Sequence, residues 1–448
     1  MSKTLIIGAG RSSLGAAKLL NKLGKEILVS DISEKYPDQI QSIRNAGFPL
    51  IIGPQTDDLL EGVDQLIVSP GLPSQLPILE AARNLKIPIR SEIDLALENF
   101  HGPVIGITGT NGKSTTTTLI AHLLDKLGVG AIASGNIGIP PSFILADDVR
   151  VEAFVLELSS YQLEFSQQIR NKCSVFTSFS EDHMERHKNM RSYFLAKWRL
   201  MMATEPSGFC IMPRVVVEAA RAFKAPIPKA TLVQVIVDRE KPVRWSGPQL
   251  VIHLDTKKGL LKGDGILGAR PIPEDLGFHN KLNLIYSVLA VQSLRKTSWD
   301  RCVEALSSYA WLPYRFQNIG TWNGFPVYND SKSTNVESTL VALQSVTQPC
   351  VLLLGGLPKG ESYKPIKAFK SKIATLITFG AASEKISEEL EELHPFAFST
   401  LKEALQELPR FFERTPGPLV FSPACSSFDE FLNFEDRGEF FNRNYRKI

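Results

Sequence analysis

The sequence is poor in the features that mark several classes of protein. It has only five cysteines in 448 residues, and no two of them form a C-x-x-C pair. This argues against a disulfide framework or a structural zinc site and favours a reducing compartment. No segment reaches the roughly 18 apolar residues of a membrane helix, and the first residues, "MSKTLIIGAG", resemble a strand and a glycine turn more than a signal peptide. We therefore expect a cytoplasmic protein with no membrane insertion.

Neither sign of charge is in large excess. The net charge is +3 over the whole length, which is too weak to indicate nucleic acid as a main partner. Apolar residues make up 43% and charged residues 22%, as in ordinary globular proteins. The length favours about three domains. No internal repeat or low-complexity tract is visible.

What the sequence does contain is an alternation of strand and helix patterns in three blocks. We place these at residues 1–98, 99–311 and 312–448. The alternation predicts an α/β protein with parallel, doubly wound sheets. The first and last blocks are expected to be Rossmann-like. The middle block is expected to be a P-loop nucleotide-binding domain, with "VQVIVD" and "QLVIHL" as appended antiparallel strands.

The middle block opens with the strongest motif, "VIGITGTNGKSTTTT" at residues 104–118. An apolar strand leads into glycines, Lys113, Ser114 and then a helix. This order suits a phosphate, because a helix N-terminus and a glycine-rich backbone offer N–H groups to an anion. Ser114 could hold the accompanying Mg²⁺. The match to a P-loop is incomplete, since Ile107 stands where a glycine is usual, and a glycine-rich turn with an incidental lysine is the alternative.

The amino-terminal "GAGRSS" nearly matches a dinucleotide fingerprint, with Ser13 in place of the third glycine. Asp31 follows the second strand, where a ribose-binding acid would lie. The turn could hold a dinucleotide or another nucleotide diphosphate, or be purely structural. Ser69 and Gly71 end a further strand and could form a second part of that site or an ordinary turn.

Several polar residues follow other predicted strands of the middle block. Glu157 ends an apolar strand and is placed like the Mg²⁺-side acid of a nucleotide site. His183 lies in a charged loop and could contact metal or phosphate, while Asp182 and His187 are left open. Lys197 sits among apolar residues of a helix, where a lysine usually reaches out to water.

Two clusters mark the last block. Asp330, Lys332 and Thr334 follow a strand in "YNDSKSTN", and Ser427 lies in "SPACSSFDEFLNFEDRG". A capped turn is the alternative explanation of the first cluster. For Phe431 in the second cluster we prefer core packing.

Taken in order, "GITGTNGKSTTT", "ELSSYQLE", "DHMERH", "LPYRFQ", "NDSKSTN" and "SPACSSFDEFLNFEDRG" resemble the Mur ligases of bacterial cell-wall synthesis over the whole chain. "NDSK" and "SPAC" resemble the members that add D-glutamate to UDP-N-acetylmuramoyl-L-alanine. The resemblance implies a UDP-binding first domain, a central domain for ATP and Mg²⁺, and a last domain for D-glutamate. It also implies that ATP activates the acceptor carboxylate as an acyl phosphate.

The resemblance assigns residues to each ligand. The implied catalytic residues are Lys113, His183 and Lys197, the last as a carbamylated lysine. The implied ATP-binding residues are Gly109, Thr110, Asn111, Gly112, Lys113, Ser114, Thr115, Asn280, Asn283, Arg315, Asp330 and Lys332. The implied metal ligands are Ser114, Glu157, His183 and Lys197. The implied contacts to the UDP substrate are Ser12, Asp31, Ser69, Gly71, Asn136 and Ser159. The implied D-glutamate contacts are Thr334, Lys359, Ser427 and Phe434.

Three positions depart from the family pattern. These are Ser13, Tyr314 where histidine is frequent, and Pro358 where an acid is common. Other readings stay open: an NAD-dependent oxidoreductase with an accessory domain, a non-catalytic nucleotide-binding regulator, or a Mur ligase that adds another amino acid. We expect small-molecule substrates and a monomer.

Overall fold

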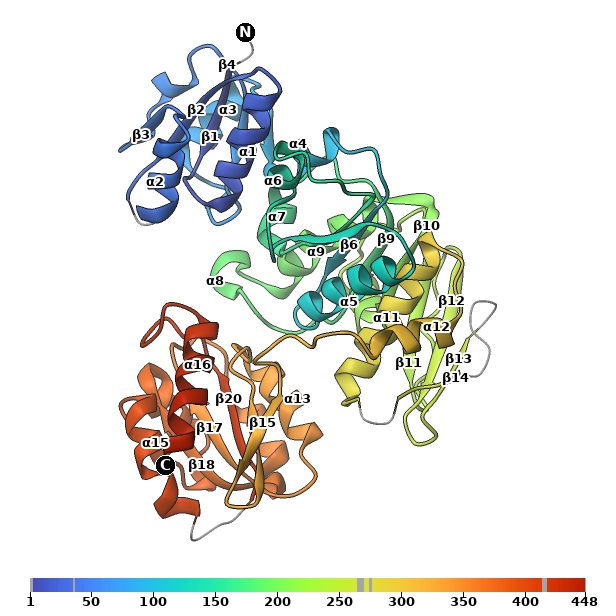
Figure 1. Cartoon of the computed structure of the whole chain (residues 1–448), viewed down its shortest axis with the longest axis vertical. Coiled ribbons are helices and arrows are strands. Elements are labelled where there is room, and N and C mark those ends of the chain that lie inside the picture. The colour runs from blue at the N-terminus through green and yellow to red at the C-terminus, as the bar shows by residue number, and fades with distance from the viewer. Residues whose placement is uncertain (1–2, 35–36, 264–269, 274–275, 413–416, 448) are drawn as a thin grey trace. The chain divides into compact units, whose positions relative to one another are not determined.

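Three β-sheets form the framework of the protein, which is described here as a computed structural model (Figure 1). The structure describes residues 3–34, 37–263, 270–273, 276–412 and 417–447. In Figure 1 the amino-terminal sheet is blue, the central one runs from cyan to yellow, and the carboxyl-terminal one is orange and red. The prediction of a mixed α/β protein with three sheet-containing regions is confirmed. The Rossmann-like description and the boundaries near residues 98 and 311 stay predictions.

The chain divides by its contacts into two compact units. The first unit comprises Met1–Phe179, Asn189–Leu276 and Asn280–Tyr309. The second unit comprises Ser180–Lys188, Gly277–His279 and Ala310–Ile448.

The amino-terminal sheet has the strand order β3-β2-β1-β4-β5, and all of its pairs are parallel. Its strands are β1 Lys3–Ile7, β2 Glu26–Asp31, β3 Leu50–Ile52, β4 Val63–Val68 and β5 Ile89–Ser91. Its helices are α1 Arg11–Lys22, α2 Pro37–Asn45, η1 Asp57–Leu60, α3 Pro77–Asn84 and α4 Glu92–Glu98. Helix α1 ends two residues before Gly24, which takes a φ of +69° that glycine adopts without strain.

The central sheet has the order β14-β13-β12-β11-β10-β9-β6-β8-β7. Its strands are β6 Val104–Thr108, β7 Ala131–Gly135, β8 Ala153–Glu157, β9 Asn171–Phe176, β10 Thr204–Pro213, β11 Thr231–Val237, β12 Gln249–Asp255, β13 Leu260–Gly263 and β14 Arg270–Pro271. The helices of this region are α5 Lys113–Lys126, α6 Pro141–Ala146, α7 Ser160–Phe165, α8 Met184–His187, α9 Met190–Met202, α10 Arg214–Ala222, α11 Phe278–Leu294 and α12 Trp299–Leu306.

One expectation about this sheet is wrong. The segments "VQVIVD" and "QLVIHL", expected to be antiparallel, are β11 and β12, and they pair parallel to each other. Strand β11 is also parallel to β10. The connection over residues 238–248 is long enough to return the chain to the same end of the sheet, as a parallel pair requires. The antiparallel part lies further along, where β12 pairs with β13 and β13 with β14.

The carboxyl-terminal sheet has the order β15-β16-β20-β17-β18-β19. Only the β15–β16 pair is antiparallel among the pairs described in this sheet. Its strands are β15 Gln317–Trp322, β16 Phe325–Asn329, β17 Cys350–Gly355, β18 Ile373–Phe379, β19 Phe396–Ala397 and β20 Leu419–Ala424. Its helices are α13 Val336–Ser345, η2 Lys364–Lys372, η3 Gly380–Ala382, α14 Ser383–Glu389, η4 Glu391–Leu393, α15 Leu401–Phe412, α16 Phe434–Asn444 and η5 Tyr445–Lys447.

Each sheet is covered by helices that bury its apolar strands. Strands β6, β8, β17 and β20 are buried at every position, which explains their continuous apolar sequences. Parallel strands end at the same edge of a sheet, so the polar residues that follow them gather there. In the part of the chain that is described, no helix combines the length and apolar character needed to span a membrane.

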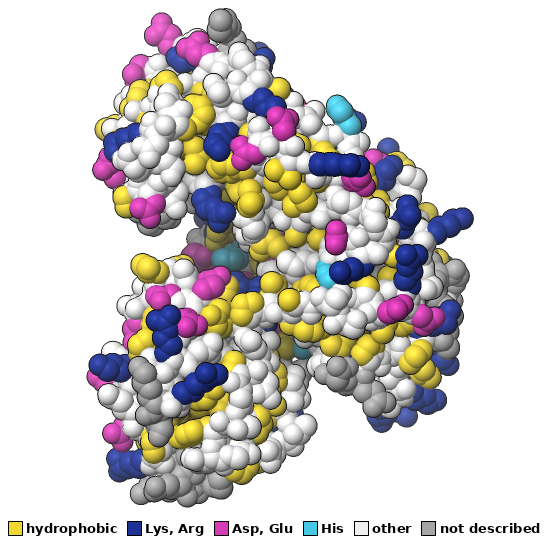
Figure 2. Space-filling model, viewed as in Figure 1, with side chains coloured by type: hydrophobic (Ala, Val, Ile, Leu, Met, Phe, Trp, Pro, Cys, Tyr) yellow, Lys and Arg dark blue, Asp and Glu magenta, His cyan; other side chains and the backbone are white. Residues whose placement is uncertain are grey.

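The surface carries both signs of charge. Figure 2 shows Lys and Arg side chains interspersed with Asp and Glu over the visible face. This distribution agrees with the small net charge of the chain.

Candidate active site

The glycine turn after β1 is held by residues that the sequence analysis assigned to the UDP substrate. Asp31 Oδ2 accepts a hydrogen bond of 2.7 Å from the Ala9 backbone N–H. Gly8 has a φ of +95°, and a Cβ placed on it would lie 2.7 Å from Ser69 Cβ. The fold therefore brings Asp31 and Ser69 to this turn. Asp31 has a structural task there, and its contact with a ribose stays a prediction.

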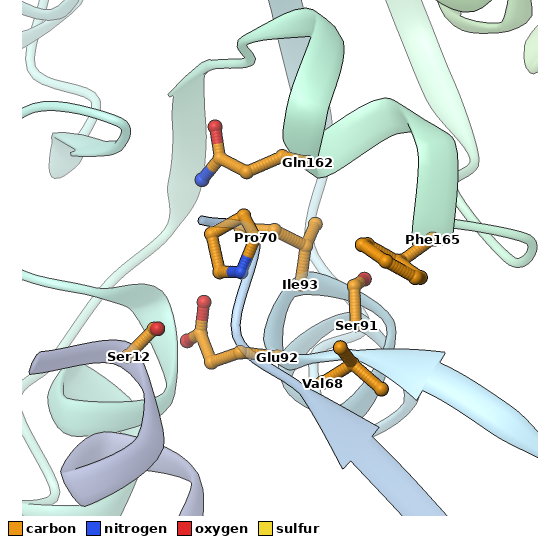
Figure 3. Close-up of a pocket in the computed structure, with 8 residues that line it drawn as sticks. All are labelled: Ser12, Val68, Pro70, Ser91, Glu92, Ile93, Gln162 and Phe165. Atoms are coloured by element: carbon orange, nitrogen blue, oxygen red, sulfur yellow. The ribbon is translucent and has the colours of Figure 1, made fainter. Parts of the chain in front are cut away.

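A pocket beside this turn contains Ser12 (Figure 3). The hydroxyl of Ser12 and the carboxyl of Glu92 point toward one another, and Gln162 and Phe165 reach in from α7. Glu92 is only 4% exposed, and its Oε1 accepts a hydrogen bond of 2.8 Å from the Ser142 N–H. Burial raises the pKa of Glu92 to about 7. The sequence analysis did not single out this carboxyl.

The predicted phosphate loop has the expected form, a strand, a loop and then a helix. Gly112 is the N-cap of α5 with a φ of +85°, and Gly109 has a φ of +143°. A Cβ on Gly109 would lie 2.1 Å from Thr177 Oγ1. Lys113 Nζ donates to the carbonyls of Gly109 at 3.0 Å and Thr110 at 2.8 Å, and so is held over the loop. The loop therefore presents a cation at a helix N-terminus, as an anion site requires.

Asn283 lies against this loop although it is far away in sequence. Its Oδ1 accepts a hydrogen bond of 3.2 Å from Thr116 Oγ1. A Cβ on Gly112 would lie 2.8 Å from the same oxygen. Asn280 is linked to Asn283 by a hydrogen bond of 3.3 Å. The structure thus brings both asparagines to the phosphate loop, and their contact with ATP stays a prediction.

Glu157 stands at the end of β8, in the strand next to β6. It is 2% exposed, and its Oε1 accepts a hydrogen bond of 2.8 Å from Asn136 Nδ2. Its other oxygen, Oε2, is buried and has no hydrogen-bond partner in the described chain. Leaving a carboxylate oxygen buried and unpaired is costly unless a cation compensates it. An oxygen of this kind fits Mg²⁺, which prefers hard oxygen ligands.

Lys197 on α9 does not reach water. It is 2% exposed, and its Nζ donates to the Gly109 carbonyl at 2.7 Å. The same nitrogen lies 4.6 Å from the centre of the Tyr193 ring. The usual behaviour of a helix lysine is therefore overruled by the fold, and Lys197 contacts the phosphate loop directly.

Ser159 caps helix α7. Its Oγ accepts from the Gln162 N–H at 3.3 Å in a reciprocal capping box. This local task explains the hydroxyl without a ligand, so its predicted contact with the UDP substrate stays untested. Within the described ranges, no three His, Cys, Asp or Glu side chains gather into a metal-binding group. The predicted metal set, which includes a serine and a modified lysine, also stays a prediction.

In the second unit, Asp330 forms a buried polar centre. It accepts hydrogen bonds from Ser333 Oγ at 2.5 Å, Ser422 Oγ at 2.7 Å and the Phe316 N–H at 2.9 Å. Burial raises its pKa to about 6, against the opposing effect of these donors and of Arg315. A joint role of Asp330 and Arg315 toward ATP stays a prediction.

His183 and Lys359 of the second unit share one partner, Asp182. Lys359 Nζ lies 3.2 Å from Asp182 Oδ1, and His183 Nε2 lies 3.6 Å from Asp182 Oδ2. His183 has a φ of +59°, an uncommon conformation for a non-glycine residue. The sequence analysis left Asp182 open. The structure gives it a definite task, to orient two predicted site residues.

The remaining predicted D-glutamate residues lie on neighbouring loops of the carboxyl-terminal sheet. Lys332 Nζ lies 4.1 Å from the centre of the Phe434 ring. Thr334 is two residues further along the same loop as Lys332, and Ser427 follows β20, the strand that pairs with β16. The fold thus brings residues about a hundred positions apart into one region.

A residue that the sequence analysis missed lies beneath these loops. Arg437 on α16 is completely buried, and its guanidinium donates to oxygens of Ser331, Cys425 and Ser426. One sequence signal could have revealed it. Arg437 lies four positions before Phe441, on the face of α16 that faces the core.

The three departures from the family pattern have distinct surroundings. Ser13 is buried, and its hydroxyl has no hydrogen-bond partner in the described part of the chain. Tyr314 has a φ of +60° and its hydroxyl donates to Glu439 at 3.4 Å. Burial, assisted by Glu439, raises the pKa of Tyr314. Pro358 is half-buried beside Lys359.

Comparison with known proteins identifies the family. The profile of the Mur ligase middle domain matches residues 107–258, and that of the N-terminal domain of MurD-like Mur ligases matches residues 2–91. The chain is 32% identical over 444 residues to the UDP-N-acetylmuramoylalanine–D-glutamate ligase of Listeria monocytogenes, covering 97% of this chain and 94% of that relative. It is 33% identical over 453 residues to the ligase of the same name from Lactococcus lactis, covering 100% and 98%.

Solved structures agree at the level of the fold. A pseudomurein peptide ligase from Methanothermus fervidus has a TM-score of 0.58 at 17% identity and covers 99% of this chain and 100% of its own. The UDP-N-acetylmuramate–alanine ligase of Thermotoga maritima has a TM-score of 0.54 at 16% identity and covers 100% of both chains. The chain belongs to the Mur ligase family. The resemblance noted in the sequence is thereby confirmed, and with it the prediction of a ligase.

Proposed function

We propose that this Mur ligase joins D-glutamate to UDP-N-acetylmuramoyl-L-alanine in peptidoglycan precursor synthesis and converts ATP to ADP and phosphate. The names of its full-length relatives support this substrate pair. The motifs "NDSK" and "SPAC" support it independently.

One observation carries the ATP-dependent part of the proposal. Glu157 Oε2 is buried without a partner at the end of β8, and the neighbouring strand β6 leads into the phosphate loop. A carboxylate oxygen left open beside a helix N-terminus that presents Lys113 is suited to a cation that accompanies a nucleotide.

In the first half-reaction, an oxygen of the L-alanyl carboxylate attacks the γ-phosphorus of ATP, and ADP leaves. Lys113 neutralises the charge that builds on the transferring phosphoryl group, and the backbone N–H groups of the loop hold the phosphates. Asn280, Asn283, Arg315, Asp330 and Lys332 would hold the rest of the nucleotide.

In the second half-reaction, the amine of D-glutamate attacks the acyl carbon. A tetrahedral species forms, the bond to the phosphate oxygen breaks, and the proton lost from the amine passes to solvent or phosphate. Closure of the site against water protects the acyl phosphate from hydrolysis. Thr334, Lys359, Ser427 and Phe434 would surround the amino acid.

The donor set fits Mg²⁺. Ser114 and Glu157 would hold one ion, and His183 with carbamylated Lys197 a second. When bound, Mg²⁺ would supply charge neutralisation at the phosphate oxygens. Lys197 already lies within hydrogen-bond distance of the loop that would hold those phosphates, which supports a role for it beside the nucleotide.

The UDP substrate would extend from the glycine turn after β1, with Ser12, Asp31, Ser69 and Gly71, toward Asn136 and Ser159. In keeping with the parallel strands of the amino-terminal sheet and the mostly parallel strands of the carboxyl-terminal sheet, we infer that the terminal domains are Rossmann-like. We also infer a cytoplasmic, monomeric enzyme.

Phosphate release tests the proposal directly. Purified enzyme is incubated with ATP, Mg²⁺ and UDP-N-acetylmuramoyl-L-alanine, together with D-glutamate, L-glutamate, L-lysine, L-alanine or a diamino acid. We expect phosphate release only in the reaction in which D-glutamate is the amino acid. Faster phosphate release with another amino acid would show that the enzyme is a Mur ligase with a different amino-acid specificity. Release that needs no acceptor would overturn the ligase assignment, and hydride transfer from a nicotinamide would support the oxidoreductase reading.

A further inference from the structure

Arg437 is an unusual buried cation, because its hydrogen bonds go to neutral oxygens. Its Nε donates to Ser331 Oγ at 3.1 Å, and its Nη2 donates to the Ser331 carbonyl at 2.8 Å. Its Nη1 donates to the carbonyls of Cys425 and Ser426 at 3.0 and 3.1 Å. Burial lowers its pKa to about 10, so the guanidinium remains charged near neutrality. Desolvating a charge in this way is costly and needs all of these acceptors.

The acceptors belong to two separate loops. Ser331 begins the loop that leads to Thr334, and Cys425 and Ser426 immediately precede Ser427. The two loops follow β16 and β20, which pair side by side. One planar guanidinium thus fixes the spacing between two predicted D-glutamate contacts.

A third loop is tied to the same point. The Leu357 N–H donates to the Ser426 carbonyl at 2.8 Å, and the Ser426 N–H donates to the Leu357 carbonyl at 3.0 Å. Gly356 has a φ of +126°, and a Cβ on it would lie 2.9 Å from Arg437 Nη1. The absence of a side chain at Gly356 therefore lets this loop, which carries Lys359, lie against the guanidinium.

The start of α16, the helix that carries Arg437, is joined to the same group of hydrogen bonds. Ser331 Oγ accepts from Arg437 and donates to the Phe434 carbonyl at 2.8 Å. Phe434 begins α16, three residues before Arg437. All four predicted D-glutamate contacts, Thr334, Lys359, Ser427 and Phe434, therefore lie on segments joined through this one buried side chain.

We propose that Arg437 is a positioning residue that sets the geometry of the D-glutamate pocket without touching the amino acid. The proposal rests on the proposed function for the identity of the substrate. It assigns to Arg437 an effect on D-glutamate binding that is separate from ATP and from acyl phosphate formation. A lysine would keep the charge, but its single nitrogen could not reach acceptors on two loops.

The test uses the full chain and three variants. Arg437→Lys keeps the positive charge but loses the planar guanidinium, whose three nitrogens donate to the two loops. Ser331→Ala removes one acceptor and the link to Phe434 and disturbs the fold less. The matched control, Ser383→Ala, deletes another buried hydroxyl of the same sheet region, which bonds Thr378 Oγ1 at 2.8 Å and lies outside the three loops. For each variant, KM is measured for D-glutamate, ATP and the UDP substrate, with thermal unfolding alongside.

Formation of the acyl phosphate is followed without D-glutamate, by trapping it with hydroxylamine. We expect Ser331→Ala to raise KM for D-glutamate about tenfold and Arg437→Lys by more, in line with the loss of buried hydrogen bonds. Trapping and KM for the other substrates should stay within about twofold of wild type. Ser383→Ala should match wild type in every KM.

Other outcomes overturn the positioning role. If Ser331→Ala and Arg437→Lys lower the thermal stability while KM for D-glutamate stays at the wild-type value, Arg437 is only structural. If all three KM values rise together, its effect is not specific to the amino acid. Failure of the wild-type enzyme to use D-glutamate is a separate result, because it would contradict the proposed function itself. If Arg437→Lys does not fold, Ser331→Ala decides alone.

Discussion

The predicted phosphate loop and the proposed amino-acid pocket are built in opposite ways. In the phosphate loop, residues 104–118 supply strand, loop and helix in one run, and Lys113 bonds carbonyls three and four residues earlier. In the amino-acid pocket, Arg437 bonds Ser331, which lies 106 residues away in the chain. The first is a local structure and the second is assembled only by the fold.

This difference has an energetic meaning. A local loop keeps its shape as long as its strand and helix form, so changing its side chains should affect chemistry more than stability. A pocket assembled from distant loops depends on buried hydrogen bonds, so changing these should move the loops and alter binding. The following substitutions test that contrast.

Lys113→Ala should have the largest effect. Lys113 is held over the loop by two carbonyls and is only partly buried, so the thermal stability should change little. Loss of a cation aimed at the transferring phosphoryl group should cost on the order of 3 kcal/mol or more in the barrier. Steady-state phosphate release at saturating ATP measures the effect. Turnover near that of wild type would remove this loop from the mechanism.

Lys197→Ala should come next, with activity lowered about a hundredfold, as expected when a group that supports transition-state charge is removed. Because Lys197 is predicted to act as a carbamate, formate or acetate should partly restore activity by supplying a carboxylate in the vacated space. The matched control is Lys113→Ala, which formate should not rescue. Full activity of Lys197→Ala without any additive would contradict the predicted role.

Gly112→Ala should have a smaller effect, because it leaves every charge in place. An alanine would have to adopt a φ of +85°, and its Cβ would lie 2.8 Å from Asn283 Oδ1. We expect a cost of about 2 kcal/mol, typical of backbone strain at such positions, and a higher KM for ATP. Gly128→Ala is a matched control, since Gly128 has a φ of +77° but open space around its Cβ. Equal KM values for ATP in the two variants would show that the contact with Asn283 is unimportant.

Glu92→Gln should have the smallest effect, and one visible only through pH. The environment of Glu92 is assembled from distant segments, and its pKa is raised from 4.5 to about 7. The folded protein then binds a proton more tightly than the unfolded chain, so the free energy of unfolding falls as pH rises between these values. Between pH 6 and pH 8, we expect the free energy of unfolding to fall by about 1 kcal/mol more in the wild type than in Glu92→Gln.

Denaturant unfolding at the two pH values measures this loss. Asp94 is a nearby carboxylate that contributes to the raised pKa of Glu92, and it is present in both proteins. The same pH dependence in wild type and variant would show that Glu92 is ionised throughout this range.

Much of the fold could be predicted from the sequence. Strand β1, the strand–loop–helix run of β6 and α5, and the helix that carries Lys197 were expected where they are found, because their residue patterns are local. The parallel pairing of β11 and β12 was not predicted, because parallel and antiparallel pairing are both compatible with the same alternating side chains. The path of the connection, residues 238–248, decides between them.

In the candidate site, too, some features could be predicted from the sequence and others could not. The sequence by itself determined the phosphate loop, the strand-end acid Glu157 and the family, because these depend on residue type and order over short stretches. Only the tertiary structure decided that Lys197 is buried against Gly109, that Asp182 joins His183 and Lys359, and that Arg437 lies beneath three loops. The physical reason is that burial and hydrogen-bond partners are properties of packed surroundings, and for these residues the partners come from distant parts of the chain.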